Sequence, residues 1–260
     1  MDEGLNERLE VAIKAAKEAG LMVMDADKNS KKDFIEKNKN DFVTNFDLKS
    51  ERLIIDKIKE NFPEDGIFGE EGGNQKGKNG RWIIDPIDGT VNFLRGIPNY
   101  TISIAFEREK FKPLIGVVYN PRQDELFYAV KDLGSFCNGE KISVSNISNP
   151  NKAIVVVVPP HRRKEKADLY FRKMREIFDQ VSDLRSFGSA ALECCYIAAG
   201  RLDCYFELAL GYYDFAAGMV ILRESGGELR SIGGDFTDSY CDVVATNTHL
   251  TNWLLPLVGE

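Results

Sequence analysis

The sequence predicts an α/β protein with two lobes, and two observations lead to this class. In the second half of the chain, short apolar runs of strand length alternate with helical patterns, which indicates layered packing of helices on sheets. The first half begins with two helical patterns and continues with a series of strands, as an α+β lobe does. With 260 residues, of which 43% are hydrophobic, the chain can form one large domain or two lobes that share a core.

Two helices are expected before the first strands. From Leu5 to about Met24, apolar side chains recur on one helical face. Asp47 has the character of an N-cap, so a second helix is expected to begin there and run to about Asn61. A turn and then a polar loop to about residue 81 separate this helix from the strands.

The remaining elements divide at a change in composition. In the first half, strands are expected at 82–84, 100–107, 114–119 and 125–130, with a hairpin turn at Asn138-Gly139. In the second half, strands are expected at 153–158, 184–187, 202–206 and 243–246, and helices at 165–180, 189–199, 214–224 and the C-terminus. Because Ser, Asn and Pro gather near Asn146–Asn151, we expect an N-terminal α+β lobe at 1–148 and a C-terminal α/β lobe at 149–260.

The most informative segment is Trp82–Phe93, which joins a buried strand to a polar turn. Its apolar run ends at Asp85, Pro86 is expected to prevent the strand from continuing, and the glycine after Asp88 permits a sharp turn. Two carboxylates three residues apart are thus set at the end of a rigid element, beside the Thr90 hydroxyl and backbone amides. This arrangement suits a hard divalent cation and a phosphate held side by side.

Other acidic residues also stand at the ends of elements, although each has a plainer explanation when taken alone. Glu70 precedes a second glutamate in an acidic loop, and Asp214 opens a helical pattern as an N-cap would. Most of the 41 acidic residues are expected to be solvated, and Asp-Pro-x-Asp-Gly is a common turn. In combination, however, carboxylates that converge at element ends could supply the oxygen ligands that magnesium prefers.

Four motifs resemble those of the inositol monophosphatase family, which shares a superfamily with the fructose-1,6-bisphosphatases. They are residues 41–47 (Asp-Phe-Val-Thr-Asn-Phe-Asp), 69–71 (Gly-Glu-Glu), 82–93 and 214–218 (Asp-Phe-Ala-Ala-Gly). The likeness runs in order through the whole chain. It implies a layered α-β-α-β-α sandwich of the inositol monophosphatase and fructose-1,6-bisphosphatase type.

The resemblance also implies the residues of an active site. The metal ligands would be Glu70, Asp85, the Ile87 carbonyl, Asp88 and Asp214, holding two to three Mg²⁺ ions. The catalytic residues, which would polarise and orient the attacking water, are Glu70, Thr90 and Asp47. The substrate would contact Ile87, Asp88, Gly89, Thr90, Gly188, Ser189, Ala190, Glu207 and Asp214. Lys37, in the loop before residue 41, would close the site.

The function that the resemblance implies is Mg²⁺-dependent hydrolysis of a small phosphate monoester by metal-activated water, with inositol monophosphate as the first candidate. Fructose-1,6-bisphosphatase activity, or action on another sugar or nucleotide phosphate, stays open. Glu207 favours a polyol, whereas a second phosphate would prefer a cation such as Arg162 or Arg163. A role as a regulator that binds the transcription machinery is the alternative of a different class.

Two departures from the family pattern are expected to leave activity intact. Tyr213 stands where Trp is common, and Val91 stands where Thr is common. Neither position supplies a metal ligand. The basic segment His161–Lys166 is either a solvated helix start or a contact with substrate or a partner.

Composition sets further expectations. The net charge of −7 argues against a mainly electrostatic nucleic-acid binder. No apolar run reaches the roughly 18 residues of a membrane span, and the acidic N-terminus lacks a signal pattern, so we expect a cytoplasmic protein without membrane contact. Five irregularly spaced cysteines are expected to be reduced thiols. Members of the family that the chain resembles are often homodimers, and a homodimer is expected here.

Overall fold

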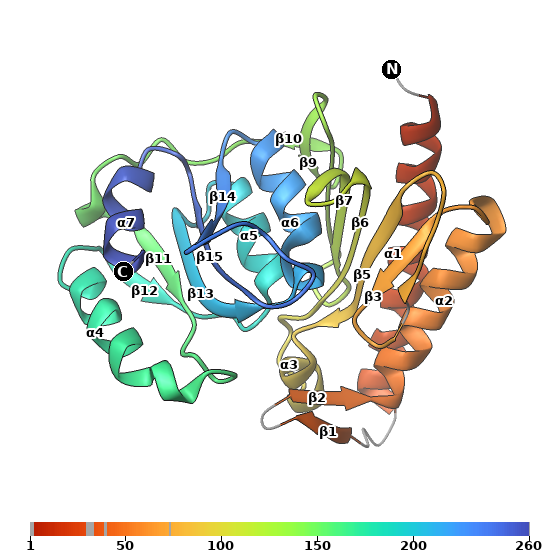
Figure 1. The fold of residues 1–260 in the computed structure, drawn as a ribbon, viewed down its shortest axis with the longest axis horizontal. Coiled ribbons are helices and arrows are strands. Elements are labelled where there is room, and N and C mark those ends of the chain that lie inside the picture. The colour runs from red at the N-terminus through yellow and green to blue at the C-terminus, as the bar shows by residue number, and fades with distance from the viewer. Residues whose placement is uncertain (1–2, 30–33, 39–40, 73, 260) are drawn as a thin grey trace.

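The computed structural model describes residues 3–29, 34–38, 41–72 and 74–259, with backbone alone at 3, 27–29, 34–38 and 41–43. Its elements form five layers (Figure 1). In order, these are helices α1 (Glu3–Asn29) and α2 (Asn45–Asn61), an eight-stranded sheet, helices α5 (Ala190–Ala198) and α6 (Tyr212–Glu224), a five-stranded sheet, and helices α4 (Ala167–Phe178) and α7 (Thr251–Val258). Buried apolar clusters fill the spaces between the layers. The layered α-β-α-β-α sandwich is therefore confirmed.

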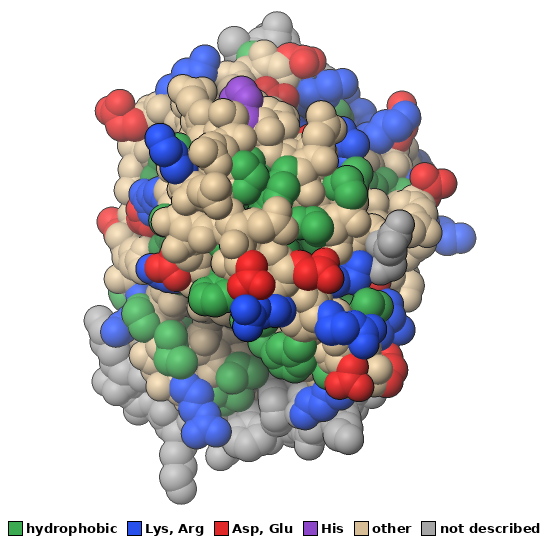
Figure 2. Space-filling view, turned by 90° about the vertical axis from the view of Figure 1, so that its left-hand side faces the viewer, with side chains coloured by type: hydrophobic (Ala, Val, Ile, Leu, Met, Phe, Trp, Pro, Cys, Tyr) green, Lys and Arg blue, Asp and Glu red, His purple; other side chains and the backbone are tan. Residues whose placement is uncertain are grey.

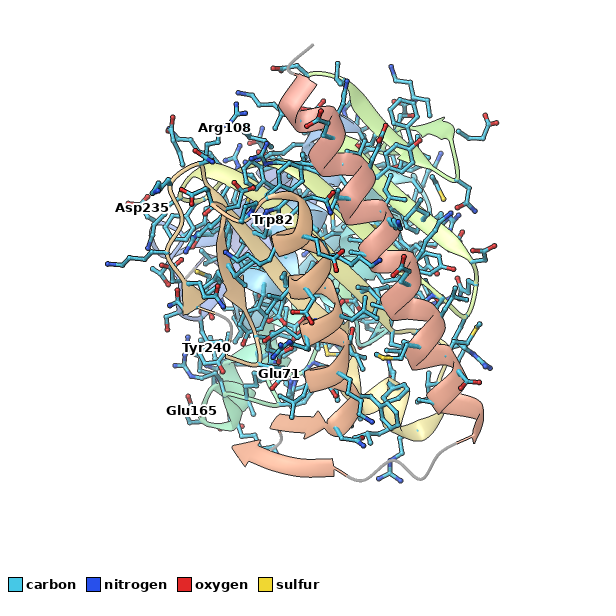
Figure 3. The ribbon with its side chains drawn as sticks, turned by 90° about the vertical axis from the view of Figure 1, so that its right-hand side faces the viewer. Glu71, Trp82, Arg108, Glu165, Asp235 and Tyr240 are labelled. Atoms are coloured by element: carbon cyan, nitrogen blue, oxygen red, sulfur yellow. The ribbon has the colours of Figure 1, made fainter. Side chains whose placement is uncertain are left out.

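Helices α1 and α2 cover the outer face of the larger sheet (Figure 3). Helix α1 buries Ala12, Ala16 and Val23, as the periodicity predicts, and continues five residues past Met24 to Asn29. Helix α2 ends at Asn61 as predicted. The prediction that Asp47 is its N-cap is wrong. The N-cap is Thr44, and Asp47 is the third helical residue, whose side chain accepts a hydrogen bond from the Thr44 backbone N–H in a capping box.

Among the described residues, eight strands form the larger sheet in the order β10-β9-β8-β7-β6-β5-β3-β4. They are β3 (Gly66–Gly69), β4 (Asn74–Gln75), β5 (Arg81–Asp88), β6 (Thr101–Glu109), β7 (Lys112–Asn120), β8 (Glu125–Val130), β9 (Gly134–Cys137) and β10 (Glu140–Ile142). Strands β3 and β5 are parallel, and the other neighbours are antiparallel. All the strands predicted here are present, and the Asn138-Gly139 turn joins β9 to β10 with positive φ at both residues.

The expectation that Pro86 ends strand β5 is wrong, because β5 runs on to Asp88. The pairing of β5 with β6 is irregular here: Asp85 lies opposite Ser103, and Asp88 lies opposite Thr101. Two residues of β5 thus face one residue of β6, and such a bulge tolerates a proline because its N–H is not needed in the ladder. The irregularity lies between Asp85 and Asp88, the two carboxylates of this strand.

The smaller sheet, among the described residues, has five strands in the order β12-β11-β13-β15-β14. They are β11 (Ile154–Val157), β12 (Asp183–Arg185), β13 (Cys204–Leu210), β14 (Glu228–Ile232) and β15 (Cys241–Thr246). Strands β11, β12 and β13 are parallel, and β15 runs antiparallel to β13 and β14. The predicted strands and helices of this half are all present, and β14 is an additional strand that was not predicted.

Short elements complete the chain. A hairpin that was not predicted, β1 (Phe34–Asn38) and β2 (Asp41–Thr44), leads into α2, and α3 (Thr90–Arg95) follows β5. Single 3-10 turns occupy Pro150–Lys152 and Lys164–Lys166. The segment between β10 and β11 joins the two sheets, and the division into lobes at residue 148 stays a prediction.

Figure 2 views the molecule from the side of α4 and α7, where apolar side chains are scattered among charged ones. Helix α4 exposes Leu169, Phe171 and Phe178. Within the described part of the chain, no helix has the length and apolar character needed to cross a membrane.

Candidate active site

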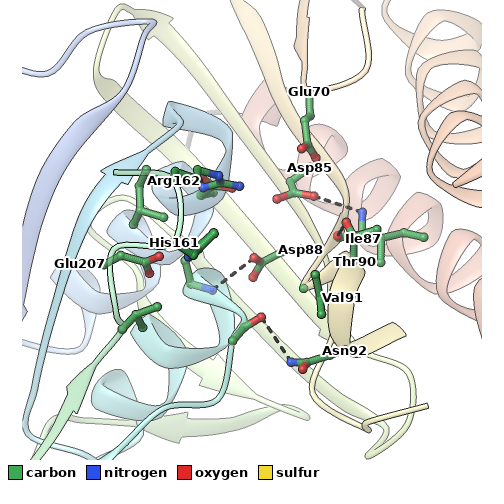
Figure 4. Close-up of a pocket in the computed structure, with 16 residues that line it drawn as sticks. Glu70, Asp85, Ile87, Asp88, Thr90, Val91, Asn92, His161, Arg162 and Glu207 are labelled. Atoms are coloured by element: carbon green, nitrogen blue, oxygen red, sulfur yellow. Dashed lines mark hydrogen bonds and ion pairs between the residues drawn. The ribbon is translucent and has the colours of Figure 1, made fainter. Parts of the chain in front are cut away.

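A cavity of about 340 Å³ lies where the end of β5 and the start of α3 face the smaller sheet (Figure 4). Ten of the predicted site residues line it: Glu70, Asp85, Ile87, Asp88, Gly89, Thr90, Gly188, Ala190, Glu207 and Asp214. The other two, Asp47 and Ser189, lie behind the lining and contact it by hydrogen bonds to Thr90 and Asp88. Residues more than 140 positions apart in the sequence therefore meet in one pocket.

Three carboxylates form the centre of the site. Asp85, Asp88 and Asp214 are buried, and each offers an oxygen that lies within 4.8 Å of the others. They come from the end of β5 and from the first turn of α6, so the cluster joins the larger sheet to the helix layer between the sheets.

Asp88 is held by the beginning of helix α5. Its carboxylate accepts hydrogen bonds from the backbone N–H groups of Ala190 (3.2 Å) and Ala191 (2.9 Å) and from the Ser189 hydroxyl (2.5 Å). Burial, followed by the charge of Asp214, raises the pKa of Asp88 to about 7, although these donors oppose the shift. The hydroxyl of Ser189 thus donates to Asp88, and a contact between Ser189 and the substrate stays a prediction.

Asp214 and Asp47 are held in the same way at the starts of two different helices. Asp214 is the third residue of α6, not its N-cap, and its Oδ2 accepts the N–H of Gly211 at 2.6 Å. Asp47 is the third residue of α2, and its Oδ2 accepts the N–H of Thr44 at 2.8 Å. Each carboxylate is thereby fixed by its own helix start, which also favours negative charge.

Asp85 is the most crowded of these acids. It is 1% exposed, and its Oδ1 accepts the N–H of Ile87 at 3.1 Å. Burial first, then the charges of Glu70, Asp88 and Asp214, raise its pKa well above the usual value. Glu70 reaches the pocket from the loop after β3, where the Glu70 N–H donates to the Ile84 carbonyl at 3.1 Å.

The cluster fits a divalent cation. Buried carboxylates that repel one another are costly unless a cation or protons compensate their charge. Hard oxygen ligands at this spacing match Mg²⁺ or a similar ion. The residues that would hold it are the three clustered aspartates, with Glu70 and the Ile87 carbonyl at the same wall of the pocket.

The Thr90 hydroxyl lies between two acceptors. Its Oγ1 is 3.2 Å from Asp47 Oδ1 and 3.1 Å from the Ile87 carbonyl oxygen, and its single proton can satisfy one of them at a time. Gly89, just before it, has φ of +92°, and a side chain there would meet the carbonyl oxygens of Asn99 and Gly188 at 2.9 Å. The turn therefore requires glycine, and it sets Thr90 against the wall of the pocket.

The opposite wall carries Glu207 in the middle of strand β13. Glu207 is 4% exposed and accepts a short hydrogen bond from the Tyr205 hydroxyl. Burial is the main reason that its pKa is raised to about 8. The loop of Gly188 lies nearby, and its backbone is bound by Asn92 and by Glu193.

Sequence reasoning missed one residue that supports this wall from behind. Glu193 is fully buried in α5, and its Oε1 accepts the N–H groups of Phe187 (2.7 Å) and Gly188 (3.1 Å). A single acidic residue inside an otherwise apolar helix was the signal for it. Arg162 lines the pocket with His161, which is itself exposed, so these two residues fit the alternative of a contact with substrate, and that contact stays a prediction.

Lys37, expected in a loop, lies in strand β1, and its side chain is outside the described residues. Its role as a closing residue therefore stays a prediction. The five cysteines are free thiols, as expected, and none of them lines the pocket.

Comparisons with known proteins match nearly the whole chain. The model of the inositol monophosphatase family matches residues 5–260. Nus factor SuhB of Vibrio cholerae is 39% identical over 229 residues, covering 87% of this chain and 85% of that protein. The structure of extragenic suppressor protein SuhB from Bartonella henselae has a TM-score of 0.92 at 32% identity, covering 98% of this chain and 99% of the other. For inositol monophosphatase from Anabaena, the TM-score is 0.87 at 29% identity, with coverage of 98% and 96%.

Proposed function

Because this chain belongs to the inositol monophosphatase family, we propose that it is a Mg²⁺-dependent phosphatase that hydrolyses a small phosphate monoester, inositol monophosphate first among them. The observation that carries the proposal is the gathering of Asp85, Asp88 and Asp214 in a pocket whose opposite wall holds Glu207. Neither wall alone would support this proposal, because one wall offers ligands for a cation and the other offers an acceptor for the hydroxyl groups of a polyol.

The chemistry assigned to each residue follows from its contacts. Bound divalent cations would lower the pKa of a water molecule and neutralise the phosphoryl oxygens. Glu70, Asp85 and the Ile87 carbonyl would hold one ion, and Asp85, Asp88 and Asp214 would hold a second. Glu70 would help to hold a third. Thr90, which bridges Asp47 and the Ile87 carbonyl, would orient the attacking water together with Asp47 and Glu70. The backbone amides of Gly89 and Thr90 would contact the phosphate.

The choice of a polyol rests on Glu207, which lines the pocket from the far wall. A carboxyl group can accept hydrogen bonds from neighbouring hydroxyls of a ring and, when protonated, can donate one to them. Gly188 and Ala190 line the same side and leave room for the ring, because their side chains are small or absent. Arg162 keeps a bisphosphate, such as fructose 1,6-bisphosphate, as the alternative substrate of the same site.

Phosphate release from a panel of esters tests the proposal. Inositol monophosphates, fructose 1,6-bisphosphate, an adenosine bisphosphate and histidinol phosphate would be compared with Mg²⁺ and with EDTA. We expect release from inositol monophosphate with Mg²⁺ and none with EDTA. A protein that hydrolyses no ester in the panel, or that hydrolyses them equally in EDTA, would contradict the proposal.

A second candidate is a regulatory role that involves the transcription machinery, and the relative named Nus factor SuhB supports it. This role can be separated from catalysis with the Asp88→Asn variant, which alters the cation cluster and no exposed surface. If the variant lacks phosphatase activity and still restores function in cells that lack this protein, the regulatory role is favoured. Loss of both would favour the enzyme. The expected homodimer would be tested by light scattering after gel filtration.

A further inference from the structure

Arg162 brings a positive charge into the pocket that holds the carboxylate cluster. It follows strand β11 in the segment Pro159–Arg163, and Figure 4 shows its guanidinium extending into the pocket from the wall opposite Asp85. Its side chain is 21% exposed. One terminal nitrogen lies 3.4 Å from Asp214 Oδ2 and 3.5 Å from the Ala209 carbonyl oxygen.

The guanidinium is only partly satisfied by these contacts. Both distances are at the long end for hydrogen bonds, and the Nε atom is buried with no hydrogen-bond partner among the described residues. A guanidinium stays protonated in proteins even when it is partly buried. The side chain therefore stays charged inside the pocket, where the acids attract it.

Asp214 is the point at which this charge meets the cation cluster. The same oxygen that contacts Arg162 also accepts the Gly211 N–H at 2.6 Å, so the carboxylate cannot turn away without breaking the start of α6. A cation bound by Asp214 would therefore lie close to the guanidinium. Two positive charges that share one carboxylate oppose each other, and the low polarity of a buried site strengthens the effect.

We propose that Arg162 weakens cation binding at the cluster of Asp85, Asp88 and Asp214, and that its displacement by a substrate anion couples the loading of metal and substrate. The inference rests on the proposed function only in requiring that this cluster binds a divalent cation. A substrate phosphate or other anion offers the guanidinium a better partner than Asp214. By linkage, an anion that draws Arg162 away strengthens cation binding, and a bound cation strengthens anion binding to the same degree.

Isothermal titration of the full chain with Mg²⁺, in buffer free of phosphate and substrate, tests the inference. We expect Arg162→Met to bind Mg²⁺ about tenfold more tightly than the wild type, which is the scale of one partly buried charge contact. Arg162→Lys, which keeps the charge, should stay near the wild-type affinity. Arg163→Met is the matched control, because Arg163 points to Glu165 on the surface and its loss should change the affinity less than about twofold.

Unchanged or weaker Mg²⁺ binding by Arg162→Met would overturn the inference and would leave the phosphatase proposal standing. Absence of Mg²⁺ binding by both the wild type and Arg162→Met would overturn both. Circular dichroism establishes that each variant is folded. If Arg162→Met fails to fold, Arg162→Gln takes its place, because it retains hydrogen-bond donors without the charge. Its Mg²⁺ affinity is then compared with that of the wild type.

Discussion

The two walls of the pocket hold their acidic groups by different means. On the wall formed by β5 and its neighbours, the carboxylates of Asp85 and Asp88 accept backbone N–H groups, whose positions the sheet and the start of α5 determine. On the wall formed by the smaller sheet, Glu207 depends on the hydroxyl of Tyr205 and lies in the field of Arg162. Groups fixed by backbone have one geometry, whereas groups fixed by side chains can adjust to the molecule that binds.

This difference suggests a division of labour between the walls. A cation cluster for in-line hydrolysis needs ligands held within a few tenths of an ångström, and rigid elements provide that. Selection among substrates needs contacts that can be changed without disturbing the chemistry. Substitutions on the first wall should therefore reduce turnover, and substitutions on the second should change which ester is bound.

The largest effect is expected from Asp85→Asn. Asp85 would contact both principal ions, so its loss should lower kcat by at least about 1000-fold, given that one preorganised electrostatic contact is worth 100- to 1000-fold. The measurement is phosphate release at saturating Mg²⁺ and substrate. Turnover close to that of the wild type would contradict the assignment of Asp85 as a metal ligand.

Stability provides the control for this variant. Because burial and then neighbouring charges raise the pKa of Asp85, its ionised form is unfavourable in the folded protein without a cation. Asp85→Asn should therefore unfold in EDTA at the same temperature as the wild type or a higher one. A lower unfolding temperature would attribute lost activity to a damaged fold.

Glu207→Gln should act on the second wall. We expect KM for inositol monophosphate to rise about tenfold, which is the size of one hydrogen bond to a charged or polar group, with kcat little changed. Hydrolysis of p-nitrophenyl phosphate, which has no ring hydroxyls, should be unaffected. Equal losses on both esters would mean that Glu207 supports the fold of the site instead of selecting the polyol.

Glu193 should have a smaller effect on the same wall, because it acts through the backbone of the Gly188 loop. Replacement by Ala removes the acceptor of two partly buried N–H groups, those of Phe187 and Gly188, at a cost of about 1 kcal/mol in the free energy of unfolding. KM for the polyol ester should rise several-fold as the loop loosens. Glu193→Gln keeps an acceptor of the same shape and should restore KM, whereas Glu193→Met fills the space without an acceptor and should not. Rescue by Glu193→Met would mean that the role of Glu193 is purely steric.

The raised pKa of Glu207, on the second wall, also predicts that the stability of the fold depends on pH. Glu207 has a folded-state pKa of about 8, raised from 4.5 chiefly by burial. A carboxyl with a raised pKa favours folding when protonated, so its stabilising contribution is complete below pH 4.5 and is lost as the pH rises to about 8. Urea unfolding in EDTA should show stability falling across this window, and Glu207→Gln should flatten the fall. An equally steep fall in the variant would assign the dependence to other groups.

The sequence located the first wall better than the second, and the physical reason is local. Asp85, Asp88 and Asp214 lie in short motifs where a strand ends or a helix begins, so their neighbours in sequence are also their neighbours in space. Arg162 and Glu193 owe their positions to the packing of the smaller sheet against the helix layer. No local pattern records that packing, and a basic segment after a strand is more often solvated.

The same contrast holds for the fold. Helices α1 and α2 and the central strands were predicted because each has a strong apolar period of its own. Strand β14 was missed because it is short and mostly unburied and exists through pairing with β15. The extension of β5 past Pro86 was missed because the bulge depends on the register of β6, which is not visible in the sequence of β5.

The smallest effect is expected at Val91, which lines the first wall and is still 50% exposed. Val91→Thr adds the hydroxyl that is common in the family, but no acceptor of the cluster depends on this position, so kcat/KM should change less than about twofold, as for most exposed substitutions. Its neighbour provides the matched contrast. Thr90→Val removes the hydroxyl that contacts Asp47 and Ile87, and kcat should fall about 100-fold. If the two substitutions changed activity to a similar degree, the loss would come from altering any side chain near the pocket. The position of the Thr90 hydroxyl would then have no particular role.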